Sequence, residues 1–154
     1  MRIDSHQHFW SYSHEEYDWI DDSMSVLKQD YLPSHLSPNL EASQIQKSVA
    51  VQARTTDHET EWLLSLAKEN PPIAGVVGWI DLKSDDLENK LKQYKNEEKL
   101  VGFREILQAE SLNFMLEEKF IAGLKLLHHY NYTYDILVFP KHLKAVSQLI
   151  KKLP

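Results

Sequence analysis

The stretch SVAVQARTTDHETEWLLSLAKENPPIAGVVGWIDL, residues 48–82, decides the fold class. Its first six residues form an apolar, β-branched run that predicts a strand. An amphipathic helix with Asp57 as its N-cap is predicted next, because apolar residues recur on one helical face: Trp62, Leu63, Leu66 and Ala67. Two prolines end that helix, and residues 73–82 predict a second strand. Strand, helix and strand in this order are typical of a βαβ unit in a parallel sheet.

The same alternation extends in both directions from this unit. Further strands are expected over residues 3–9, 101–108 and 134–139, and further helices over residues 40–46, 84–94, 114–130 and from Pro140 to the end. Residues 10–38 show no clear period and are expected as a long loop. Residues 1–154 are therefore expected to form a single α/β domain of about five βα units.

Five βα units fit two architectures. One is an open, doubly wound sheet, and the other is an incomplete (β/α)8 TIM-type barrel, whose full form has about 250 residues. Hydrophobic periodicity does not separate them. A doubly wound sheet with a phosphate site is disfavoured, because none of the four glycines lies in a Gly-rich strand-to-helix loop: Gly75, Gly78, Gly102 and Gly123.

Composition excludes several functional classes. With 42% hydrophobic residues the chain is expected to fold, and its net charge of −6 argues against a nucleic-acid surface. No apolar stretch approaches the length of a membrane span, so no membrane partner is expected. Cysteine is absent, which excludes disulfide and thiolate chemistry. Together these features predict a cytoplasmic protein.

Two histidines one residue apart, His6 and His8, are the leading candidates for chemistry. Strand side chains alternate between faces, so Asp4, His6 and His8 are expected on one face of the first strand. Imidazole is a good ligand for zinc-type metals, but two ligands do not complete a site. The ordinary alternative is a pair of surface or hydrogen-bonded core histidines. Their place at the carboxyl end of a strand favours a site, because active sites of parallel α/β sheets lie there.

The other predicted strands also end in polar residues. These are Gln52, Arg54, Trp79, Asp81, Arg104, Gln108 and Asp135, with His142 just after the last strand. Arg104 has two interpretations, because a guanidinium in an apolar strand is costly to bury without a partner. It either forms an internal ion pair with Glu105 or Asp81, or it binds a substrate carboxylate or a developing oxyanion.

Five stretches, in chain order, resemble the amidohydrolase-related lactonase family. They are IDSHQHFW, VAVQARTTDHET, AGVVGWIDL, VGFREILQ and YDILVFPKHL, and the resemblance covers nearly the whole chain. DSHQHFW and VGFREILQ are its most specific parts. This family includes the sugar-acid lactonases, such as L-fucono- and L-rhamnono-lactonase, and the 2-pyrone-4,6-dicarboxylate lactonase.

The resemblance implies a (β/α)8 barrel, of which this chain is the N-terminal part, and hydrolysis of a small lactone. It implies that His6, His8 and Arg104 are catalytic and that His6 and His8 hold any metal. The cofactor is then one divalent, zinc-type ion, although a metal-independent mechanism also fits the group. The substrate-binding residues implied are Gln52, Arg54, Trp79, Gln108, Asp135 and His142.

The resemblance also implies parts that the 154 residues do not contain. The aspartate that serves as general acid/base is expected beyond residue 154, so lactonase activity is expected of the full barrel and not of this chain alone. The alternative function is a non-catalytic half-barrel that binds a small acidic ligand or a partner chain. Because an incomplete barrel has open strand edges, association with a second copy is also expected.

Overall fold

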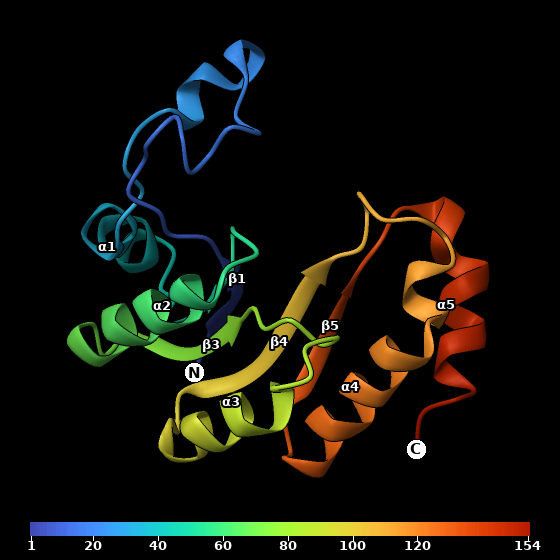
Figure 1. Cartoon of the computed structure of the whole chain (residues 1–154). Helices are drawn as coiled ribbons and strands as arrows, with labels where there is room; N and C mark the ends of the chain where they lie inside the picture. The colour runs from blue at the N-terminus through green and yellow to red at the C-terminus, as the bar shows by residue number, and fades with distance from the viewer.

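The computed structural model describes residues 1–154, which form a five-stranded parallel sheet curled into a half-barrel with helices along its outside (Figure 1). The strands are β1 (Ile3–Gln7), β2 (Lys47–Val51), β3 (Ile73–Gly78), β4 (Leu100–Ile106) and β5 (Thr133–Leu137). They neighbour one another in chain order, without the reversal of a doubly wound sheet. The five predicted parallel strands and the incomplete-barrel architecture are confirmed.

A helix follows every strand. The helices are α1 (Pro33–Ala42), α2 (Asp57–Glu69), α3 (Leu87–Gln93), α4 (Glu118–His129) and α5 (Leu143–Ile150), and short 3-10 turns cover Asp22–Leu27, Tyr94–Asn96, Phe114–Leu116 and Pro140–His142. The structure contains no helix that is both long enough and apolar enough to span a bilayer.

The helix predicted over residues 40–46 was wrongly placed. Helix α1 begins at Pro33, where proline suits the first helical turn, and it continues through Pro38. It ends at Ala42, before Gln44 adopts a positive φ of 55°. Only Leu40 is buried in this helix, so its amphipathic pattern is weak. The expected loop over residues 10–38 was therefore too long at its C-terminal end.

Two other helices differ from their predicted bounds. Thr56, not Asp57, caps α2, because its hydroxyl accepts a hydrogen bond from the Glu59 backbone N–H. The helix expected over 114–130 is divided at Glu117, whose extended backbone separates a 3-10 turn from α4. These shifts move helix ends without changing the strand order.

The main core lies between the sheet and its outer helices. It contains 21 buried hydrophobic residues, among them Phe103 of β4, Leu63 of α2 and Leu124 of α4. A smaller cluster of Trp10, Tyr17 and Ile20 forms the core of the segment that follows β1. This segment, residues 10–31, is called the arm, and it rises beside the carboxyl end of β1 in Figure 1. The half-barrel and the arm thus have separate cores.

Candidate active site

Three side chains converge on the inner face of the sheet. The Nε2 atoms of His6 and His8 lie 3.0 Å apart, and the Nη1 atom of Arg104 lies 3.2 Å from His6 Nε2. The two histidines come from the end of β1, and Arg104 comes from β4, 98 residues along the chain. Strand pairing in a curled parallel sheet thus brings together the three residues that the resemblance marked as catalytic.

Partners on the protein fix the proton positions of the two imidazoles. His8 Nδ1 lies 2.8 Å from the Val51 carbonyl oxygen, which can only accept, so Nδ1 carries the proton. Burial, countered by this hydrogen bond and reinforced by the nearby Arg104 charge, lowers the pKa of His8 to about 4. His8 Nε2 therefore presents a lone pair at neutral pH.

His6 is arranged in the same way. Arg104 can only donate, so His6 Nε2 accepts its hydrogen bond. Burial and the Arg104 charge lower the pKa of His6, although Asp135 and Asp4 oppose them. Arg104 thus uses the one Nε2 lone pair of His6, and a cation held between His6 and His8, whose Nε2 atoms lie 3.0 Å apart, would replace that hydrogen bond.

The geometry fits two of the ligands of a zinc-type ion. Tetrahedral zinc with Zn–N bonds of about 2.0–2.1 Å places two nitrogens about 3.3 Å apart, close to the separation observed here. The structure contains no group of three or more His, Asp or Glu side chains placed to share an ion. Two ligands fit, and the remaining positions would need water or groups outside these residues.

Arg104 is buried without a carboxylate partner. It is 6% exposed and forms no ion pair with Glu105 or Asp81, so the internal ion-pair interpretation was wrong. Its Nη2 atom donates instead to the backbone oxygen and the Oε1 atom of Gln52. Burial lowers the pKa of Arg104, and the negative charge of Asp135, its register partner on β5, opposes this. The Nε atom is buried with no partner.

Arg54 lies in a different environment. Its guanidinium pairs with Glu16 of the arm and with the fully buried Glu59 of α2, and it lies 5.3 Å from the centre of the Tyr17 ring. Glu59 also accepts from the Ala53 backbone N–H. Arg54 therefore joins the arm to the half-barrel, and the structure does not bring it into contact with His6 or His8.

Trp79 and Glu105 form a second polar contact at the carboxyl ends of the strands. Trp79 Nε1 donates to Glu105 Oε2 at 2.8 Å, and burial raises the pKa of Glu105. The Thr60 hydroxyl bonds both backbone groups of Trp79. This close approach needs Gly78, because a Cβ atom there would lie 2.5 Å from Thr60 Oγ1. Thr60 and Glu59 were not predicted from the sequence, since both lie in an ordinary helical pattern.

The last two predicted site residues lie apart from the histidines' contacts. Gln108 is half-buried in the turn after β4. His142 is fully buried and caps the turn after β5, where its Nδ1 accepts from the Phe139 backbone N–H at 3.1 Å. The substrate-binding roles of both stay predictions.

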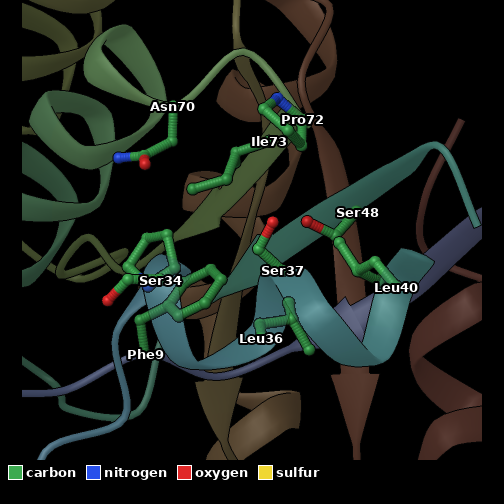
Figure 2. Close-up of a pocket in the computed structure, with 10 residues that line it drawn as sticks. Phe9, Ser34, Leu36, Ser37, Leu40, Ser48, Asn70, Pro72 and Ile73 are labelled. Atoms are coloured by element: carbon green, nitrogen blue, oxygen red, sulfur yellow. The ribbon is translucent and has the colours of Figure 1, made fainter. Parts of the chain in front are cut away.

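Two hollows border α1. A groove of about 430 Å³ follows the free edge of β1 and includes His8 in its lining. A smaller cavity of about 150 Å³ lies between α1 and the beginning of β2 and β3, lined by Phe9, Ser34, Ser37, Ser48, Asn70 and Ile73, among others (Figure 2). The smaller one is on the outer side of the sheet, away from Arg104, so it is separate from the candidate site.

Comparisons with known proteins identify relatives of the whole chain. An L-fucono-1,5-lactonase of Burkholderia multivorans is 43% identical over 149 residues, which cover 96% of this chain and 50% of the relative. A crystal structure of an amidohydrolase from Burkholderia multivorans with bound zinc superposes with a TM-score of 0.94 at 42% identity, covering 99% of this chain and 54% of that one. The resemblance to the amidohydrolase-related lactonases is confirmed.

More distant structures share the fold. A probable 2-pyrone-4,6-dicarboxylic acid hydrolase of Acinetobacter baumannii has a TM-score of 0.76 at 18% identity, covering 97% of this chain and 54% of that one. No model of a known protein family matches the chain. The chain spans about half the length of the curated lactonases it matches.

Proposed function

We propose that this chain forms the metal-binding and substrate-polarising part of a hydrolase that opens sugar-acid lactones. The observation that carries the proposal is the convergence of two imidazole Nε2 atoms and one guanidinium on the inner face of the sheet. The similarity to L-fucono-1,5-lactonases supports a lactone as substrate. The zinc in the related amidohydrolase structure supports a divalent ion.

The reaction adds water to the ring carbonyl carbon and breaks the ring C–O bond. The hydroxyl of water joins the carbonyl carbon, and a proton ends on the alkoxide that leaves, which gives a hydroxy acid. A bound zinc ion would polarise the carbonyl and lower the pKa of a bound water. His6 and His8 would hold that ion through Nε2, and the Val51 carbonyl keeps the His8 ring turned toward it.

Arg104 supplies the fixed positive charge of the site. It makes no ion pair with a carboxylate, so its charge is available to a substrate carboxylate or to the oxyanion that forms during water attack. Asp135, its register partner on β5, is the carboxylate that acts on both Arg104 and His6. We infer that Asp135 limits how much positive charge the site accumulates.

The test is hydrolysis of L-fucono-1,5-lactone and a panel of other sugar-acid lactones, with spontaneous ring opening subtracted. It is run on this chain alone and on this chain fused to the remaining half of the Burkholderia multivorans lactonase. We expect the fusion to hydrolyse the lactone. We expect His6→Ala and His8→Ala each to reduce this turnover at least a hundredfold. The exposed His128→Ala variant serves as a control with unchanged turnover.

Metal content gives a second, independent readout. After dialysis, we expect the wild-type protein to retain zinc and both His6→Ala and His8→Ala to have lost it. Unchanged turnover in these two variants would refute the proposed site. Turnover that falls while zinc stays at background would refute the metal and leave the lactonase proposal in place.

A further inference from the structure

Arg104 has an unusual set of partners for a buried cation. Three of its five N–H groups donate within the protein: two from Nη2 to Gln52 and one from Nη1 to His6. Gln52 in turn donates its own Nε2 to the Arg104 backbone oxygen at 3.2 Å. Every one of these acceptors is neutral, so the guanidinium keeps its full charge.

Gln52 is equally committed to Arg104. Its side chain is fully buried, its Oε1 accepts from Arg104 at 3.0 Å, and its backbone N–H donates to the Val77 carbonyl at 2.8 Å. The pair connects β2 to β4 across the intervening β3. Rotation of the guanidinium would break both Nη2 bonds, so this contact fixes its plane.

We propose that Gln52 is a positioning residue that holds Arg104 in place without cancelling its charge. This charge then stays available to the oxyanion that forms when water attacks the neutral lactone and to the carboxylate of the sugar acid that results. The inference rests on the proposed function, since it names what Arg104 recognises there. It gives Gln52 a role through Arg104 in place of direct contact with substrate.

The choice of an amide at position 52 has a physical reason. A glutamate there could accept the same two Nη2 hydrogen bonds, but it would form a buried ion pair with no net charge. A leucine would keep only the bond from Nη2 to the backbone oxygen of residue 52 and would lose both side-chain bonds. Arg54 shows the first of these outcomes within the same chain, because Glu16 and Glu59 both pair with it.

Gln52→Glu tests what the net charge of Arg104 contributes, and Gln52→Leu tests what its fixed position contributes. Gln93→Glu, on the exposed surface of α3, is the control for an added negative charge. The Arg104 Nε–H group is buried, so its proton is expected to exchange slowly and to give a resolved ¹H–¹⁵N resonance. Titration with L-fuconate, the acid formed from L-fucono-1,5-lactone, then follows anion binding at this resonance.

We expect the Arg104 resonance to persist in Gln52→Glu while L-fuconate binds at least tenfold more weakly. In the fusion, kcat for the neutral lactone is expected to fall more than its KM rises, because the lost charge acts on the oxyanion that forms during the reaction. In Gln52→Leu the slow exchange is expected to be lost. L-fuconate binding by Gln52→Glu as tight as wild type, or no binding by the wild type, would overturn the inference. L-fuconate binding without any lactone turnover by the fusion would overturn the proposed function alone. If Gln52→Leu fails to fold, Gln52→Glu still decides.

Discussion

Arg54 and Arg104 are two largely buried cations that end up with opposite partners. The Arg54 side chain is 13% exposed and contacts two carboxylates, one on the arm and one on α2. Arg104 is 6% exposed and contacts an amide, a carbonyl and an imidazole, all neutral. A buried cation that is neutralised within the protein supports structure, whereas one that keeps its charge is available to a ligand. This difference separates the region that anchors the arm from the region that forms the candidate site.

The strongest test of the comparison is Arg54→Met. The change leaves the Glu59 carboxylate buried without its cation, so the free energy of unfolding should fall by about 3 kcal/mol or more. Urea denaturation measures this free energy of unfolding. The matched control is Lys68→Met, which removes one partner of the exposed Lys68–Glu97 pair and should cost less than about 1 kcal/mol. Equal losses in both variants would contradict the structural role of Arg54.

The site region should respond to acid through His8. Burial depresses the folded-state pKa of His8 from 6.5 to about 4, so its stabilising effect is complete above pH 6.5 and is lost as pH falls toward 4. The loss attributable to His8 is at most about 3 kcal/mol. Urea unfolding at pH 7 and pH 4.5 should therefore show a smaller decrease for His8→Gln than for wild type. Identical decreases would show that His8 is not buried in its neutral form.

Arg104→Met should have a much smaller effect on stability than Arg54→Met. The variant loses bonds to Gln52, but it also removes a buried charge that no carboxylate neutralises, so the net change should lie within about 1 kcal/mol. L-fuconate binding should nevertheless disappear. A loss of stability as large as that of Arg54→Met would show that Arg104 is a structural cation after all.

The smallest expected effect is that of Glu16→Gln. Glu16 is half-exposed, so its ion pair with Arg54 is screened by solvent and should contribute about 0.5 kcal/mol or less. Limited proteolysis within residues 10–31 should report a looser arm before unfolding experiments detect any change. Added salt should reduce the difference between wild type and variant, and a difference that grows with salt would argue against an electrostatic contact.

The fold was largely predictable because the strands are short apolar runs separated by amphipathic helices. Chain-order neighbours then follow from the barrel interpretation. Helix α1 was misplaced because it buries only Leu40 and carries an internal proline, so hydrophobic periodicity gives little signal there. Its start was marked only by Pro33.

The candidate site was predictable at His6, His8 and Arg104, since a two-residue spacing and a buried guanidinium leave a trace in the sequence. The different environments of Arg54 and Arg104 were not predictable. They depend on which residues, 5 to 98 positions away, face each cation, and strand pairing and the arm decide that. Glu59 was missed because a glutamate in the first turn of a helix usually faces solvent.

The sheet order has a consequence for how the chain acquires its structure. Paired residues such as Ile3 and Lys47, Ser48 and Ile73, Val76 and Leu100, and Gly102 and Thr133 are 24 to 44 positions apart. When each of the strands β2 to β5 is synthesised, the preceding strand with which it pairs has therefore already been synthesised. During translation the sheet can grow one strand at a time from its N-terminal edge, with loop closures of similar, moderate entropy cost. The longest closure is the first one, across the arm, so we expect pairing of β1 with β2 to be the slowest step of assembly.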